Sequence, residues 1–224
     1  MSLSKVIKTA ELELGVTEWP RGSNKVKYNT AYYGKEVSGK NYPWCVTFPW
    51  WVFQEAGERM AFFGGGKTAR CTVLLEWYAK QGLTVPVYEV KRGDIALLNF
   101  NGKGTADHCG LVTDAGLKGG IYVVTTIEGN TSPGLEGSQD NGGSVAKKER
   151  YIRQIVAVCR PDYKEEEMPK TDYENHWAAQ HIRWAMEEGL IRGYPDGSFR
   201  PDKPVTRAEL ATILHRYHAK EGVK

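Results

Sequence analysis

The stretch Tyr42-Pro43-Trp44-Cys45 opens an apolar run, Val46 to Ala56, that predicts a helix with Cys45 at its N-terminal end. Backbone N–H groups and the macrodipole at such an end favour a thiolate over a thiol. A thiolate is the nucleophile that acyl transfer requires. The first 160 residues contain one histidine, His108, the natural proton carrier for that sulfur. The pair predicts cysteine-nucleophile chemistry, and the scarcity of histidine argues against most metal hydrolases.

Helical patterns come first along the chain and strand patterns follow. Apolar residues recur at helical spacing from Leu3 to Leu14 and again over about 68–81, and residues 20–43 read as an irregular loop. Four short runs rich in β-branched and aromatic residues come next, with turn residues between them: 94–100, 108–114, 121–128 and 151–158. This order predicts an α+β domain with an antiparallel sheet and N-terminal helices.

A charged, proline-containing segment divides the chain. Residues 1–160 form the predicted first domain, 161–171 the linker, and 172–224 a small all-α domain. Two apolar stripes mark the helices of that second domain: one runs from Trp177 to Leu190, and the other contains Leu210, Ile213, Leu214 and Tyr217.

Composition excludes several classes of protein. Of the 224 residues, 41% are hydrophobic and 25% charged, as is usual for a globular protein. The net charge of +3 is too small, and too scattered, to indicate nucleic acid binding. No apolar stretch is long enough to predict a membrane span. The N-terminus lacks the pattern of a secretory signal, so we expect synthesis in the cytoplasm.

The strand that begins at His108 has a polar partner on the next strand. Glu128 and Asn130 are two residues apart and therefore point to the same side, where either could hold the second imidazole nitrogen. Cys109 alternates to the opposite side, so we expect it not to share the site of His108.

The four cysteines, Cys45, Cys71, Cys109 and Cys159, are irregularly spaced and contain no Cys-x-x-Cys pair. This spacing disfavours a structural zinc site. Apart from Cys45, we expect these residues to be small buried hydrophobes.

Residues 1–160 resemble the CHAP domain, an amidase and peptidase module of the NlpC/P60 and papain-like group. The resemblance is carried by Tyr42-Pro43-Trp44-Cys45-Val46, Arg92-Gly93-Asp94-Ile95, Asp107-His108-Cys109-Gly110-Leu111-Val112 and Ile127-Glu128-Gly129-Asn130. It implies that Cys45 is the nucleophile and His108 the general base and then acid, with Glu128 and Asn130 completing the site. Which of the last two orients His108 stays open. Some CHAP domains hold calcium before the cysteine, but residues 28–41 contain one carboxylate, Glu36, so no metal or other cofactor is expected.

The second domain resembles a single S-layer homology (SLH) module, through Glu188-Gly189-Leu190-Ile191-Arg192-Gly193-Tyr194, Asp196-Gly197-Ser198-Phe199-Arg200-Pro201 and Thr206-Arg207-Ala208-Glu209. Such modules bind secondary polymers of Gram-positive walls. The resemblance implies that Arg207 and Trp177 contact the polymer, although Thr206 and Glu209 also have the spacing of a capping box. Because these modules usually work in threes, one copy implies weak binding or self-association.

Together the two resemblances imply a phage endolysin that cleaves peptidoglycan between N-acetylmuramic acid and L-alanine, anchored to the wall by its second domain. An endopeptidase cutting the stem peptide or cross-bridge would use the same residues. A non-catalytic wall-binding protein is the alternative from a different class.

Overall fold

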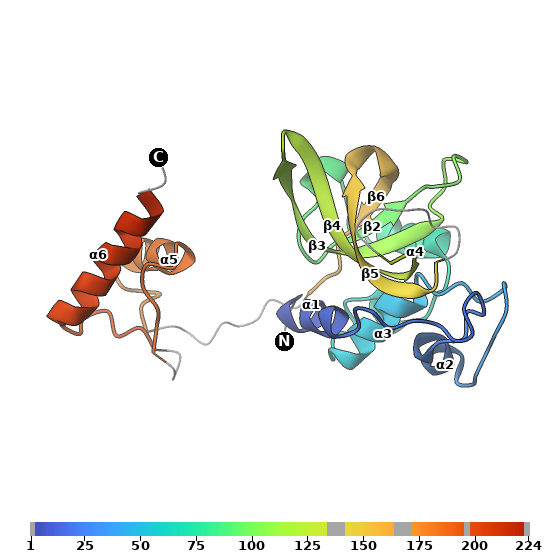
Figure 1. Cartoon of the computed structure of the whole chain (residues 1–224), viewed down its shortest axis with the longest axis horizontal. Coiled ribbons are helices and arrows are strands. Elements are labelled where there is room, and N and C mark those ends of the chain that lie inside the picture. Colours follow the sequence, from blue (N-terminus) through green and yellow to red (C-terminus); the bar gives the residue numbers. More distant parts are fainter. Residues whose placement is uncertain (1–2, 134–141, 164–171, 195–197, 222–224) are drawn as a thin grey trace. The chain divides into compact units, whose positions relative to one another are not determined.

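A computed structural model of the chain describes residues 3–133, 142–163, 172–194 and 198–221. The chain divides into two compact units, residues 1–165 and 166–224, drawn in Figure 1. Most of the predicted linker, 164–171, lies outside the described residues, as does the segment 195–197 of the second resemblance. No helix in the described ranges has the length and apolar character that crossing a bilayer would need.

The first unit is built on an antiparallel sheet of six strands. The strands are β1 (Thr84–Val85), β2 (Ile95–Leu98), β3 (His108–Lys118), β4 (Ile121–Thr131), β5 (Ser144–Tyr151) and β6 (Ile155–Cys159). Their order across the sheet is β1-β6-β2-β3-β4-β5. β3 and β4 form a hairpin whose two-residue turn, Gly119-Gly120, has φ of 58° and 81°, a conformation that glycine adopts without strain. The predicted α+β class is confirmed.

Helices α1 (Leu3–Leu12), α3 (Thr47–Glu55) and α4 (Cys71–Lys80) supply apolar side chains to one face of this sheet. In Figure 1, α1 and α3 lie along one side of the strands. The main core forms between them, with the rings of Trp44, Phe48 and Phe53 packed on Leu97, Leu111 and Ile127. A smaller apolar cluster around Leu98, Val112 and Val124 lies on the opposite face. Burial on both faces gives the strands a rigid frame for the groups at their ends.

The prediction of an irregular loop over residues 20–43 was wrong, because helix α2 (Lys27–Tyr33) forms within it. Tyr28 on this helix is fully buried, and its ring lies 5.0–5.4 Å from the rings of Trp44, Phe48 and Trp51. Its hydroxyl donates a hydrogen bond of 2.7 Å to Glu13. A seven-residue helix is too short to be stable alone, so packing of this ring accounts for it better than local propensity does.

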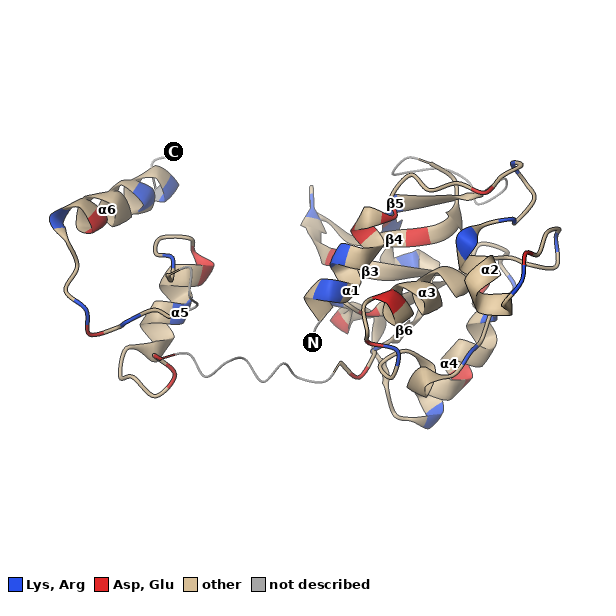
Figure 2. Cartoon of the chain, turned by 90° about the horizontal axis from the view of Figure 1, so that it is seen from below, with Lys and Arg blue, Asp and Glu red and all other residues tan. Residues whose placement is uncertain are grey.

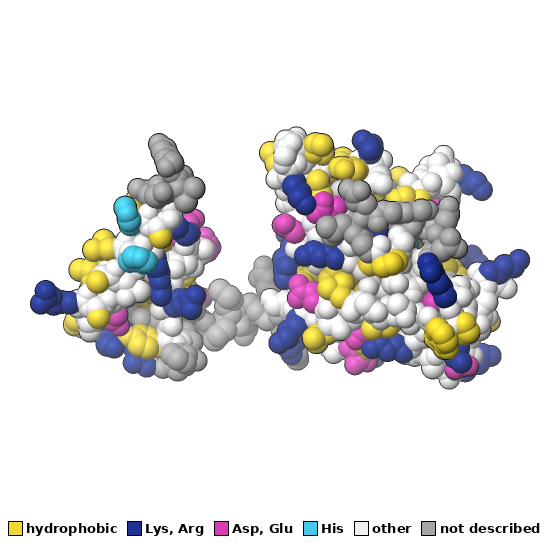
Figure 3. Space-filling view, viewed as in Figure 1, with side chains coloured by type: hydrophobic (Ala, Val, Ile, Leu, Met, Phe, Trp, Pro, Cys, Tyr) yellow, Lys and Arg dark blue, Asp and Glu magenta, His cyan; other side chains and the backbone are white. Residues whose placement is uncertain are grey.

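The second unit contains helices α5 (Ala179–Glu187) and α6 (Arg207–Glu221) and a small core of Tyr173, Ala179 and Ile182. Both hydrogen bonds of a capping box begin α6: Thr206 N–H donates to Glu209 Oε2 at 2.7 Å, and Glu209 N–H to Thr206 Oγ1 at 3.2 Å. The apolar stripe predicted for α6 is largely exposed, at 47% for Leu210 and 58% for Leu214. Hydrophobic side chains of this unit are visible on its surface in Figure 3.

Candidate active site

Cys45 lies in the turn that leads into α3, two residues before the helix begins at Thr47. The Phe48 N–H donates to the Trp44 carbonyl at 3.1 Å, so the turn wraps directly around Cys45. Pro49, the third residue of α3, has no N–H to donate to the Cys45 carbonyl, whereas Phe48 and Trp50 on either side donate to Trp44 and Val46 at 3.1 Å. The sulfur therefore lies at the N-terminal end of the helix, where partial positive charge favours a thiolate.

A carboxylate from the N-terminal segment holds the residue before the nucleophile. Glu18, only 4% exposed, accepts hydrogen bonds from the backbone N–H of Gly22 and Asn24 and from the Trp44 indole, the last at 3.2 Å. On the other side of Cys45, the Thr47 hydroxyl donates to Asn29 Oδ1 at 2.8 Å. The turn that carries Cys45 is thus fixed at both ends by buried polar contacts.

Glu128 is the direct partner of His108. Its Oε2 lies 2.9 Å from His108 Nε2, and the carboxylate has no exposed surface. Arg150 donates from Nε to Oε1 at 2.7 Å and from Nη2 to Oε2, and the Thr126 hydroxyl donates to Oε1 at 2.6 Å. Burial alone would raise the pKa of Glu128, but the hydrogen bonds and charges of Arg150 and His108 lower it to about 2. Glu128 is a carboxylate at neutral pH.

His108 connects this carboxylate to the nucleophile. Its burial lowers its pKa, whereas hydrogen bonds to the Cys45 sulfur and to Glu128 raise it, and the net result is a pKa of about 9. Since Nε2 is engaged with Glu128, Nδ1 is left for the thiol. Two neighbouring thiols, together with the interaction with His108 and the positive charge of its imidazolium, lower the pKa of Cys45 well below its usual value. The favoured state at neutral pH is a thiolate beside an imidazolium.

Two further thiols surround the nucleophile. The Sγ atoms of Cys45, Cys71 and Cys109 all lie within 4.8 Å of one another, and the Cys109 thiol donates to the Cys45 carbonyl at 3.1 Å. Hydrogen bonds from the Cys109 and Cys71 thiols are the strongest influences that lower the pKa of Cys45, against the opposing effect of burial. The expectation that Cys109 stays outside the site was wrong. Cys109 faces the helix-covered side of the sheet, as strand alternation predicts. The turn that carries Cys45 packs on the same side, and this brings the two sulfurs together.

Asn130 completes the predicted set, but it does not touch His108: among the described residues no hydrogen bond joins the two side chains. Asn130 lies at the irregular end of the β4–β5 pairing with φ of 55° and is half-buried. Phe100, from the β2–β3 loop, contacts the imidazole: the centroids of the two rings are 5.9 Å apart. The Arg150 guanidinium lies 4.7 Å from the Phe100 ring centroid. This ring helps to leave His108 only 5% exposed.

Sequence reasoning missed Arg150, Thr126, Cys71 and Phe100. Arg150 belongs to strand β5, whose sequence has four charged residues in a row at 147–150, and the structure buries Lys148 and Arg150 among them. The high charge of this stretch hid it as a strand. The nearness of Cys71 to Cys45 follows only from the packing of α4 and could not be read from spacing.

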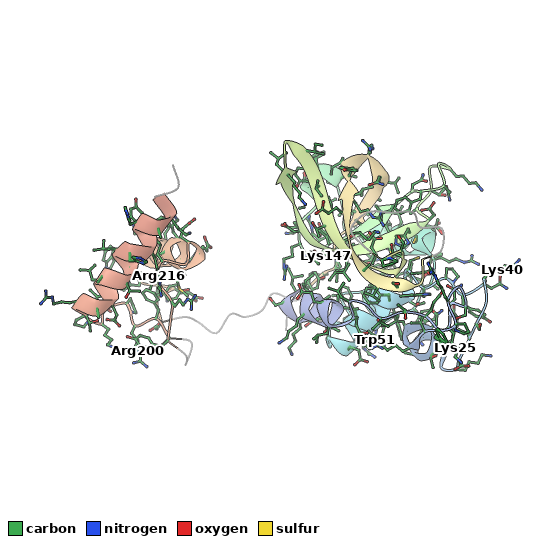
Figure 4. All side chains as sticks on the ribbon, viewed as in Figure 1. Lys25, Lys40, Trp51, Lys147, Arg200 and Arg216 are labelled. Atoms are coloured by element: carbon green, nitrogen blue, oxygen red, sulfur yellow. The ribbon has the colours of Figure 1, made fainter. Side chains whose placement is uncertain are left out.

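Arg207 is exposed on the first turn of α6, and Trp177 is 85% exposed, so both predicted polymer contacts are accessible. The same unit has a groove of about 640 Å³, lined by residues between Ile191 and Arg216. Arg207 does not line it. Cationic residues line it, and the Arg200 guanidinium and Lys203 ammonium lie 4.3 and 4.9 Å from the Tyr194 ring centroid. Arg216, labelled with Arg200 in Figure 4, also lines it and donates to the Leu190 carbonyl at 2.9 Å.

The protein combines a CHAP domain with an S-layer homology domain. Residues 37–130 match the CHAP domain family, and residues 171–211 match the S-layer homology domain family. The first match contains Cys45, His108, Glu128 and Asn130, and the second contains Trp177 and Arg207. The architecture expected from the two resemblances is confirmed.

Among curated proteins, the chain is 49% identical over 49 residues to the cellulosome-anchoring protein of Acetivibrio thermocellus, a match that covers 22% of this chain and 11% of that protein. It is also 49% identical over 47 residues to cell surface glycoprotein 1 of the same organism, covering 21% of this chain and 2% of the relative. The chain thus spans only a small part of the relatives it matches. A solved structure, that of Ly7917, aligns with a TM-score of 0.40 at 15% identity, covering 72% of this chain and 63% of that one.

Proposed function

We propose that the chain is a cysteine-dependent peptidoglycan hydrolase. The observation that carries the proposal is the electrostatic interaction of the Cys45 thiol with His108, together with the 2.9 Å contact between His108 and the buried Glu128 carboxylate, within the segment that matches the CHAP domain. Nucleophile, proton carrier and orienting carboxylate are the three groups that acyl transfer by a thiol requires. Asn130 belongs to the proposed set through the CHAP match, and it lies half-buried near the end of β4.

In the proposed reaction, the Cys45 thiolate attacks the carbonyl of an amide and forms a tetrahedral intermediate. Backbone N–H groups of the turn at Cys45 can stabilise the oxyanion of this intermediate. The His108 imidazolium donates its proton to the leaving amine, and the C–N bond breaks to leave a thioester on Cys45. Neutral His108 then takes a proton from water, the resulting hydroxide attacks the thioester, and the carboxylic acid is released. Glu128 holds the imidazole in one orientation throughout.

The bond that we propose is the amide between N-acetylmuramic acid and L-alanine, as in a phage endolysin acting on a Gram-positive wall. Cutting within the stem peptide or cross-bridge would use identical machinery, and the new termini distinguish the two activities. Digestion of purified walls followed by mass spectrometry should yield peptides with new N-terminal alanine. Any other new amine would reject the amidase assignment in favour of an endopeptidase.

The experiment that tests the catalytic proposal compares the full chain with Cys45→Ala. The loss of turbidity of a wall suspension should slow at least about 10³-fold, because Cys45 is the thiol whose pKa is lowered, whereas those of Cys71 and Cys109 are raised. Cys159→Ala is the matched control, since Cys159 is equally buried but belongs to strand β6 outside the cluster. Unchanged lysis by Cys45→Ala would reject the mechanism and favour a wall-binding protein without activity.

We propose that the second unit anchors the protein to a secondary wall polymer. The support is the match to the S-layer homology domain, the exposure of Arg207 and Trp177, and a groove in the same unit that is lined by cationic residues. Guanidinium groups form charge-assisted hydrogen bonds with the carboxylates or phosphates of an acidic glycan. Figure 2 shows the basic positions distributed along α6 and the segment before it.

Self-association through this unit is also proposed. Leu210, Leu214 and Tyr217 of α6 are 45–58% exposed, and together they form an apolar stripe that a second copy could cover. Sedimentation of the full chain should show dimers or larger species that Leu214→Glu abolishes. A monomer at all concentrations would reject this part of the proposal and leave single-site anchoring.

A further inference from the structure

The three thiols around the candidate nucleophile form a cluster that the proposed hydrolysis does not require. Acyl transfer needs one sulfur, yet the Sγ atoms of Cys45, Cys71 and Cys109 lie within 4.8 Å of one another. They come from three separate elements: the turn before α3, the first residue of α4 and strand β3. The cysteines are all buried and none is in a disulfide.

We propose that Cys45, Cys71 and Cys109 form a binding site for a soft divalent metal ion of the zinc class, with water in the fourth position. Soft thiolate ligands select such ions, and three protein ligands with one water are a known zinc arrangement. The sequence disfavoured a structural zinc site because its cysteines are irregularly spaced, but folding brings three of them together.

The distances suit the ion with small adjustments. A point among three atoms spaced no more than 4.8 Å apart lies at most about 2.8 Å from each of them, whereas a zinc–sulfur bond is about 2.3 Å. In a tetrahedral site each sulfur therefore needs to move by at most about 0.6 Å. Rotation of the cysteine side chains can supply a movement of this size without displacing the backbone.

His108 lies next to this cluster without belonging to it. Its Nε2 is held by Glu128 at 2.9 Å, and its imidazole interacts with Cys45, but the group of sulfurs spaced within 4.8 Å of one another does not include it. The fourth position of the ion is therefore left for water.

The consequence is that metal binding and catalysis exclude each other. An ion that ligates Cys45 occupies the sulfur lone pair that nucleophilic attack needs. The site would therefore hold the protein in a stable, inactive form that a stronger chelator reverses. The metal-binding part of this inference does not depend on hydrolysis, and it is tested by a measurement other than activity.

The test is titration of the full chain with Zn²⁺ in the presence of a chromophoric chelator and a non-thiol reductant. One ion per chain should bind, and the affinity should fall at least about 100-fold in Cys71→Ser and in Cys109→Ser. Cys159→Ser, a buried cysteine in β6 outside the cluster, should bind as the parent does. Circular dichroism and thermal melting would show that each variant is folded.

A second measurement identifies the ligands. Co²⁺ bound to the full chain should give an intense sulfur-to-metal charge-transfer band in the near ultraviolet and d–d bands typical of a tetrahedral site, and both should weaken in Cys71→Ser. Unchanged zinc affinity in folded Cys71→Ser and Cys109→Ser would overturn the proposal, as would Co²⁺ spectra without the charge-transfer band. Those results would assign any bound metal to surface histidines. Zinc binding with no wall-degrading activity in the metal-free chain would instead reject the proposed function and retain the metal site.

Discussion

Gly110 of strand β3 leaves the space that the Glu128 side chain occupies. A Cβ atom added at Gly110 would lie 2.8 Å from Glu128 Cγ and 2.8 Å from Thr126 Cβ, closer than carbon atoms pack in proteins. The contacting groups are the carboxylate that holds His108 and the threonine that holds that carboxylate. The absence of a side chain two residues after His108 is therefore part of how the site is built.

We predict that Gly110→Ala displaces Glu128 and lowers kcat at least about tenfold, because a misplaced orienting group weakens proton transfer. Wall turbidity assays at saturating substrate check this. Gly116→Ala is the control on the same strand, since no atom lies within 4 Å of the Cβ it would add. Full activity of Gly110→Ala would show that Glu128 does not need its present position.

Arg150→Met should destabilise the first unit by about 3–5 kcal/mol, because it leaves the fully buried Glu128 carboxylate without its counter-ion. Chemical denaturation of the full chain measures this, with Arg153→Met, an exposed position on the adjoining turn, as the control. The double variant with Glu128→Gln should recover most of the loss. If the single variant is as stable as the parent, the buried pair carries no structural role.

The pH dependence of activity should follow the Cys45–His108 pair. The pKa of His108 is raised to about 9 and that of Cys45 is lowered well below its usual value, so the thiolate–imidazolium state spans neutral pH. We predict that kcat/KM stays level through neutral pH and falls as the pH rises through about 9, where His108 loses the proton that the leaving amine needs. An activity that rises steadily through pH 9 would contradict this assignment.

Glu128→Gln tests the cause of that alkaline limit. The carboxylate raises the pKa of His108, so its neutral amide should move the limit to lower pH. The linkage to stability has the same sign: the contribution of His108 to the free energy of unfolding is full below its ordinary pKa of 6.5 and is lost as the pH rises through about 9. If the alkaline limit of activity stays at the same pH in Glu128→Gln, the raised pKa of His108 would be due to Cys45 alone.

Arg207→Ala should weaken wall binding about tenfold, equivalent to about 1.4 kcal/mol, with no change in the melting temperature. The capping box of α6 uses Thr206 and Glu209 and leaves the Arg207 side chain out, so the helix should remain intact. Sedimentation with purified walls gives the affinity, and Arg183→Ala, an exposed position on α5, is the control. A lower melting temperature with unchanged binding would give Arg207 a structural role instead.

The fold class was readable because strand and helix periodicity change once along the first domain. Helix α2 and the strands β1 and β5 were not predicted, and for α2 and β5 the reasons are physical. Helix α2 depends on burial of Tyr28 among rings from distant residues, and β5 has charged residues, Lys148 and Arg150, facing inward. Patterning reports a hydrophobic face and cannot register a strand whose buried side chains are paired cations.

For the site, the sequence named residues that the fold brings together, namely Cys45, His108 and Glu128, since strand alternation and helix ends follow simple rules. It left Glu128 and Asn130 as alternatives for the contact with His108, and the hydrogen bond of 2.9 Å belongs to Glu128. The thiol cluster was beyond sequence reasoning, because Cys45, Cys71 and Cys109 meet only through tertiary packing.

The Glu18 contact with Trp44 bears on how this domain can be cut and recombined. Glu18 precedes the first residue of the CHAP match, yet its carboxylate secures the indole adjoining the nucleophile. A chimera spliced at residue 37 would inherit Cys45, His108 and Glu128 and lose the carboxylate that holds the indole next to Cys45. The functional boundary for protein engineering therefore lies upstream of Glu18.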